Sequence, residues 1–164
     1  MKPNNYFGAA IKASPLHYCD TLQEAMPYFE VGWKGDEVCV VISRFIYFSD
    51  SYELLEECLK RGADPNAGAP DSTPLHVHYK LKFVRLLVSY GADIHARDRW
   101  GNTPLHEAQS LSLLKFYLAQ GADPFTVNDA GERPGDDYPK GKMWNKMKKY
   151  LHEFIQIQHR VQLR

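Results

Sequence analysis

The sequence has few cysteines, no excess of charge of either sign and no long apolar run. Its three cysteines, Cys19, Cys39 and Cys58, are odd in number and never closely paired. This spacing argues against a disulfide framework or a zinc knuckle and favours reduced thiols in a core. Twenty basic side chains balance twenty acidic ones, so net charge favours neither nucleic acid nor anionic lipid. The longest apolar run, residues 38–48, is interrupted by polar residues and is far shorter than the roughly 18 residues of a membrane span.

Residues 1–13 lack the apolar segment of a signal peptide, so we expect a cytoplasmic protein, with a secreted effector as the alternative. The sequence contains no phosphate-binding Gly-rich loop, His-Glu-x-x-His motif, nucleophile elbow or paired-cysteine motif. We therefore predict no enzyme, no metal, no cofactor and no small-molecule substrate. A chain of 164 residues can bury one continuous core, and we predict a single domain over residues 1–164.

What the sequence does contain is a repeat of 29 to 30 residues. Gly-Ala-Asp begins at Gly62, Gly91 and Gly121, and Thr-Pro-Leu-His begins at Thr73 and Thr103. The two signals keep step, because the same 18 residues separate each Thr from the following Gly. A weaker copy, Ser-Pro-Leu-His, occupies residues 14–17. Self-similarity at a fixed period indicates a stack of structural repeats.

Each copy is predicted to form two helices and a loop. A hydroxyl residue before proline marks a helix start, since the hydroxyl can accept from an unpaired N–H and proline is tolerated at the first helical position. A short first helix is followed by a second helix with apolar residues at helical spacing, which a glycine then ends. These apolar residues are Leu81, Val84 and Val88 in one copy and Leu111, Leu114 and Leu118 in the next. Such a short pair exposes apolar flanks on both sides, so the copies must stack.

The copy within residues 98–123 resembles the ankyrin repeat. The family pattern Asp-x-x-Gly-x-Thr-Pro-Leu-His, followed later by Gly-Ala-Asp, is present there in full. The resemblance extends with uneven quality over about residues 14–151. It implies an all-α ankyrin-repeat solenoid of about four to five helical hairpins. The units here are about three residues shorter than the usual ankyrin unit, so tight hairpins are expected.

The register divides the chain into four repeats and a cap. These segments are approximately 14–34, 35–67, 68–97 and 98–127, followed by a C-terminal cap at 128–164. The first two repeats are divergent: Pro27 would bend or shorten a helix in the first, and the second lacks Thr-Pro-Leu-His. The β-branched residues within 38–41 leave a short strand open as an alternative there.

The end of the chain is predicted to form an amphipathic helix that caps the stack. Apolar residues follow one another there in alternating steps of four and three. This stripe consists of Met143, Met147, Tyr150, Phe154, Ile157 and Val161. Docking of this helix on a partner is the alternative interpretation.

Histidine occupies the same place in three copies, at His17, His76 and His106. Stacked helices lie about 8 to 10 Å apart, whereas each ligand of a zinc ion must approach it to about 2.0 to 2.1 Å. Histidines one repeat apart therefore cannot share a metal unless the stack is broken. We expect them to hold the loop and the helix start through hydrogen bonds, as the resemblance also implies.

The loops that precede each Thr-Pro-Leu-His are expected to form a concave surface with the first helices, and the resemblance implies that a partner protein binds there. Trp100 directly follows Arg99 and lies three residues after Arg97, and both residue types are enriched among interface hot spots. The alternative is that Trp100 folds back onto the neighbouring repeat. The predicted partner-binding residues are Arg97, Arg99, Trp100, Asn102, Pro70, Ser72, Lys80, Asp129 and Glu132.

These observations predict a non-catalytic module that binds another protein. A stoichiometric inhibitor fits a chain of few repeats, for instance a bacterial immunity protein that neutralises a toxin, or a secreted effector that binds a host protein. The competing hypothesis is nucleic-acid binding by the lysine-rich helix after residue 140. Lysines that keep the terminal helix soluble explain the same residues without nucleic acid.

Overall fold

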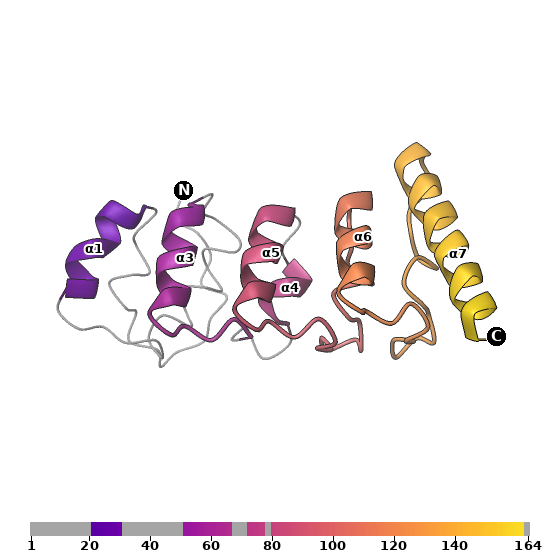
Figure 1. Cartoon of the computed structure of the whole chain (residues 1–164), viewed down its shortest axis with the longest axis horizontal. Coiled ribbons are helices and arrows are strands. Elements are labelled where there is room, and N and C mark those ends of the chain that lie inside the picture. The colour runs from indigo at the N-terminus through magenta and orange to yellow at the C-terminus, as the bar shows by residue number, and fades with distance from the viewer. Residues whose placement is uncertain (1–20, 31–50, 67–71, 78–79, 163–164) are drawn as a thin grey trace.

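The computed structural model describes residues 21–30, 51–66, 72–77 and 80–162. The helices within these ranges are α1 (Leu22–Glu30), α3 (Tyr52–Lys60), α4 (Pro74–Val77), α5 (Leu81–Ser89), α6 (Leu111–Ala119) and α7 (Lys142–Gln162). The longer helices stand side by side in chain order along the longest axis, with α1 and α7 at the two ends (Figure 1). The predicted all-α solenoid is confirmed. None of the helices described is long and apolar enough to cross a membrane.

The second helix of each unit begins and ends as the sequence indicates. The side chains of Ser51 and Ser110 accept hydrogen bonds from backbone N–H groups in the first turns of α3 and α6, at 3.3 and 3.2 Å. The helices end before Gly62, Gly91 and Gly121, whose φ angles of 89°, 93° and 93° lie in the left-handed region. The alanine after each glycine donates back to a helix carbonyl at 3.0 to 3.1 Å, which closes the helix end.

The predicted short first helix forms in one unit and is only a turn in the next. After Thr73 it is the single turn α4, and after Thr103 residues 104–107 form a turn that is not counted as a helix. The reason is length, because Leu81 and Leu111 begin the second helices only eight residues after these threonines. The expected tight hairpin is therefore a turn packed against one helix of nine residues.

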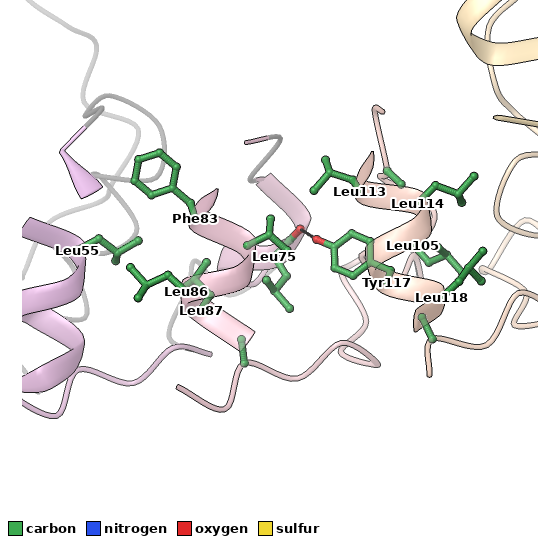
Figure 2. Packing of buried hydrophobic residues seen from close by; sticks show 14 of the residues in the cluster. Leu55, Leu75, Phe83, Leu86, Leu87, Leu105, Leu113, Leu114, Tyr117 and Leu118 are labelled. Carbon is green, nitrogen blue, oxygen red and sulfur yellow. Dashed lines mark hydrogen bonds between the residues drawn. The ribbon is translucent and has the colours of Figure 1, made fainter. Parts of the chain in front are cut away.

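One apolar core runs through the stack (Figure 2). The predicted apolar sets of α5 and α6 lie in it, with Val84, Leu114 and Leu118 buried and the other three residues half-buried against them. Tyr117 is the largest fully buried side chain, and its hydroxyl donates to the carbonyl oxygen of Leu75 at 3.2 Å. This bond joins the repeat of α6 to the repeat of α4 and α5. Burial raises the pKa of the Tyr117 phenol well above its ordinary range.

The N-terminal repeats are described only in part. Pro27 was expected to bend or shorten its helix; it lies inside α1, which has nine residues like α3, so the helix is not shortened. Helix α3 is the predicted second helix of the second repeat, and Cys58 on it is buried. The choice between helix and strand at residues 38–41 falls outside the described residues, as do His17 and Pro70.

Helix α7 confirms the predicted amphipathic helix but packs with only some residues of the predicted stripe. Met147 is buried and Tyr150 and Phe154 are half-buried, whereas Met143, Ile157 and Val161 are 47%, 58% and 65% exposed. Helix α7 has 21 residues against nine in α6, about 32 against 14 Å, so it extends past its neighbour at both ends (Figure 1). Figure 1 shows it tilting away from α6 toward the C-terminus.

Candidate protein-interaction surface

Two histidines link successive repeats through identical hydrogen bonds. Nδ1 of His76 accepts from the backbone N–H of Thr73 at 3.2 Å, and Nε2 lies 2.9 Å from the carbonyl oxygen of Asn102 in the next repeat. His106 repeats this arrangement with Thr103 at 3.0 Å and the carbonyl of Glu132 at 3.2 Å. The expected hydrogen-bonding role of these histidines is confirmed.

The arrangement also assigns the proton of each ring. Because Nδ1 accepts, the neutral ring carries its proton on Nε2 and donates it to the carbonyl 26 residues further on. Burial lowers the pKa of His106 below its ordinary 6.5, and the positive charge of Arg97 lowers it further. The hydrogen bond to the carbonyl of Glu132 raises the pKa, but by less than burial lowers it. The neutral ring therefore stabilises the contact between two loops.

The loop that carries Trp100 is held by the side chain of Asp98. Its Oδ1 accepts from the backbone N–H of Trp100 at 2.9 Å and of Asn102 at 2.8 Å. Between them Gly101 takes a φ of 74°. Asn128 has the same role in the next repeat, where its side chain accepts from the N–H groups of Ala130 and Glu132 at 3.0 and 2.9 Å. Both loop tips are thus fixed by a short polar side chain at their start.

Neighbouring loops are also bonded to each other. The backbone N–H of Asp129 donates to the carbonyl of Trp100 at 3.0 Å. Nη1 of Arg97 donates to the carbonyl of Gly101 at 3.2 Å and to that of Val127 at 3.0 Å. These bonds make the two tips one rigid unit, on which a side chain that points outward is held in place.

The side chain of Asn102 links three polar groups of the two loops. Its amide nitrogen donates to Glu107 at 3.1 Å and approaches the second oxygen of Asp98 at 3.4 Å. Its amide oxygen accepts from Asn128 at 2.9 Å. Burial raises the pKa of the Glu107 carboxyl, and the charge of Asp98 raises it further. The side chain of Asn102 therefore holds the two loops together.

Trp100 is not folded back onto a neighbour, because 54% of it is exposed. The guanidinium carbon of Arg99 lies 3.9 Å from the centre of its ring, so a cation covers one side of the indole. Val127 on the next loop is also exposed, at 43%. Sequence reasoning missed Val127; its register with Arg97, one repeat earlier, is the signal that could have found it.

The structure brings only some of the nine predicted site residues together. Arg97, Arg99, Trp100, Asn102, Asp129 and Glu132 all belong to the two bonded loops. Within this group Asn102 and Glu132 are half-buried and bonded to Asn128, so they position the tips. Ser72 and Lys80 belong to the preceding unit and are half-buried, Ser72 next to Thr73 and Lys80 at the start of α5. We define the loop-tip surface as Arg97, Arg99, Trp100, Val127 and Asp129.

The stack of short helical units with paired loops defines an α-solenoid of the protein-interaction class. The sequence pattern described as "Ankyrin repeats (many copies)" matches residues 75–110, and that described as "Ankyrin repeat" matches residues 100–129. The chain is an ankyrin-repeat protein, and ankyrin repeats are modules for binding other proteins.

Several curated proteins are similar to this chain over its repeats. Protein phosphatase 1 regulatory subunit 27 of Mus musculus is 48% identical over 59 residues, which are 34% of this chain and 38% of that protein. Ankyrin repeat protein OPG189 of Monkeypox virus is 39% identical over 42% of this chain and 13% of its own length. Potassium channel SKOR of Arabidopsis thaliana is 42% identical over 68% of this chain and 13% of its own length. The matched region thus spans well under half of each relative.

Proposed function

We propose that this chain is a non-catalytic protein that captures a partner protein through the loop-tip surface. The observation that carries the proposal is the exposure of Trp100, at 54%, on a loop whose backbone is bonded on both sides. A large aromatic ring gains much from burial, and tryptophan and arginine dominate the energies of protein interfaces. A rigid loop loses little conformational entropy when a partner covers it.

The partner experiment compares two pairs of substitutions. Affinity purification from the native host identifies the bound protein, and its affinity is then measured for the chain and for the double variant Arg99→Ala, Trp100→Ala. We expect a weakening of about 2 kcal/mol or more, roughly thirtyfold, because both residues are hot-spot types. The matched control, Arg133→Ala with Lys140→Ala, removes two exposed side chains outside the loop-tip surface and should change the affinity less than twofold or so.

Thermal unfolding distinguishes recognition from folding. Trp100 and Arg99 are exposed, so the double variant should unfold within a few degrees of the parent. A variant that loses its cooperative transition would show that the two residues are structural. An unchanged affinity in a folded variant would refute the loop-tip surface as the binding site.

We further propose that binding regulates the partner stoichiometrically. Support comes from the phosphatase relative in mouse, whose name makes it a regulatory subunit. A stoichiometric inhibitor, an immunity protein that neutralises a toxin and a secreted effector that binds a host protein are three forms of such a regulator. Titration of the purified partner's activity tests this: we expect a linear loss of activity that ends at one chain per partner. If the partner kept its full activity when saturated with this chain, the chain would bind the partner without regulating it.

A further inference from the structure

Charge is divided between the two sides of each repeat. Helices α5, α6 and α7 contain eight basic residues, two, one and five in turn, and the single acid Glu153. The connecting segments 90–110 and 120–141 contain eight acids, three and five, against four bases. The helices and the connecting segments therefore differ in the sign of their charge, although the whole chain has no net charge.

Four exposed cations form a row across these three helices. Arg85 and Lys115 stand at equivalent positions 30 residues apart, and each reaches an aromatic ring of the next helix. The Arg85 guanidinium lies 5.5 Å from the ring centre of Phe116, and the Lys115 ammonium lies 4.8 Å from that of Tyr150. Lys82, one turn before Arg85, and Lys146, four residues before Tyr150, extend the row at its two ends. We call Lys82, Arg85, Lys115 and Lys146 the basic ridge.

The charge of the basic ridge is not neutralised within the region of the chain that the structure describes. The ion pairs there join Lys60 to Glu56, Arg61 to Glu57 and Lys149 to Glu153, none of which belongs to the ridge. Three of the four cations, Lys82, Arg85 and Lys115, are also held in place by the aromatic rings that they contact. A row of preordered, uncompensated cations attracts an anionic partner at little cost in side-chain entropy.

We propose that the basic ridge binds an extended acidic segment of a partner protein. The three helices α5, α6 and α7 stand side by side (Figure 1), and neighbouring helices lie about 8 to 10 Å apart, so the ridge spans about 16 to 20 Å. An extended chain covers that distance with about six residues. Carboxylates spaced about three residues apart on such a segment would meet cations on successive helices of the ridge.

Two other anionic partners fit the ridge less well. Single-stranded nucleic acid binds by stacking its bases on open aromatic rings, and here Phe116 and Tyr150 are half-buried and each is covered by a cation. A membrane surface requires an apolar face to insert between the lipids. The exposed positions of α5 and α6 are occupied by Lys82, Arg85, Ser89, Ser112, Lys115 and Ala119.

The probe for this surface is a fluorescein-labelled peptide of about eight glutamates, which is long enough to span the ridge. Fluorescence anisotropy measures its affinity for the chain at about 50 mM salt, where charges are only weakly screened. We expect the double variant Arg85→Glu, Lys115→Glu to weaken binding about tenfold. The matched control, Lys140→Glu with Arg160→Glu, makes the same change in net charge away from the ridge, and we expect it to weaken binding less than about twofold.

Several results would overturn the proposal. These are no binding of the peptide by the parent, an equal loss in the control, or tighter binding of a single-stranded oligonucleotide of equal length that depends on Arg85 and Lys115. Circular dichroism checks folding, and Arg85→Gln with Lys115→Gln replaces the glutamate pair if that pair unfolds. The variant Arg99→Ala, Trp100→Ala should keep its affinity for the peptide, so failure at the ridge and failure at the loop-tip surface are separate results.

Discussion

Among the glycines described, Gly101 is the one where an added methyl group should lower the stability most, and Gly131 provides the control. Both glycines have left-handed φ angles, 74° and 80°, at equivalent places one repeat apart. A Cβ at Gly101 would lie 2.5 Å from Oδ1 of Asp129 and 3.0 Å from the backbone nitrogen of Asp129. A Cβ at Gly131 would meet nothing within 4 Å. The pair therefore separates the cost of the backbone conformation from the cost of the contact.

The expected magnitudes follow from these two geometries. Alanine in the left-handed region costs about 1 to 2 kcal/mol, so Gly131→Ala should lower the free energy of unfolding by about that amount. Gly101→Ala should cost the same plus about 1 to 3 kcal/mol, because Asp129 must move and its N–H then loses the carbonyl of Trp100 at 3.0 Å. The excess corresponds to about 2 to 4 °C in Tm for each kcal/mol in a domain of this size.

Urea unfolding followed by circular dichroism measures both variants, with tryptophan fluorescence as a second probe to test whether the two transitions coincide. The double variant Gly101→Ala, Asp129→Ala removes the carboxylate from the contact and should recover some of the excess. If Gly101→Ala costs no more than Gly131→Ala, the two loops do not approach as closely as described. The rigid loop tip on which the proposed partner site depends would then be refuted.

Three further predictions concern the contacts that hold the repeats. Tyr117→Phe should lower the free energy of unfolding by about 1 to 3 kcal/mol, because the buried carbonyl of Leu75 loses its donor. Tyr138→Phe should cost less, since the buried Tyr138 hydroxyl has no hydrogen-bond partner among the described residues. His106 should stabilise the fold fully above about pH 6.5 and lose this contribution as the pH falls through its lowered folded-state pKa. The difference in urea midpoint between the parent and His106→Gln should therefore shrink between about pH 7.5 and pH 5. Ser110→Ala should cost about 1 kcal/mol by removing the cap of α6, and Ser112→Ala, exposed on the same helix, should be nearly neutral.

Each of these predictions has a result that contradicts it. Equal losses in the two tyrosine variants would mean that the Tyr117 hydrogen bond adds nothing beyond burial. A stability difference for His106 that grows on acidification would mean that the native state prefers the charged ring. Equal effects of the two serine substitutions would remove capping as the reason why α6 begins where it does.

The architecture could be predicted from the sequence because its signals are local. Gly91 and Gly121 end their helices through contacts with the last turn of the same helix, and Thr103 and His106 interact across three residues. The signals that begin and end each helix therefore lie within the unit itself. The fixed period then places unit upon unit. For the short first helices the sequence pattern marks the start and leaves the end open.

The site was only partly predictable, because its members are sorted by contacts between repeats. Arg97, Asn102 and Trp100 look alike in the sequence as variable loop positions. In the structure the side chains of Arg97 and Asn102 bond to the next loop, whereas the side chain of Trp100 is exposed. Their partners lie 26 to 30 residues away in the chain. No pattern within one loop contains that information.

The sequence by itself determined the repeat, its register and the places where the second helices begin and end, because capping and chain reversal depend on neighbours within a few residues. Only the tertiary structure decided which side chains of those units are buried and which are exposed. The apolar stripe of α7 shows the reason: its pattern continues to Val161, but α6 is too short to cover it. Burial is a property of two surfaces in contact, and the sequence of one helix describes only one of them.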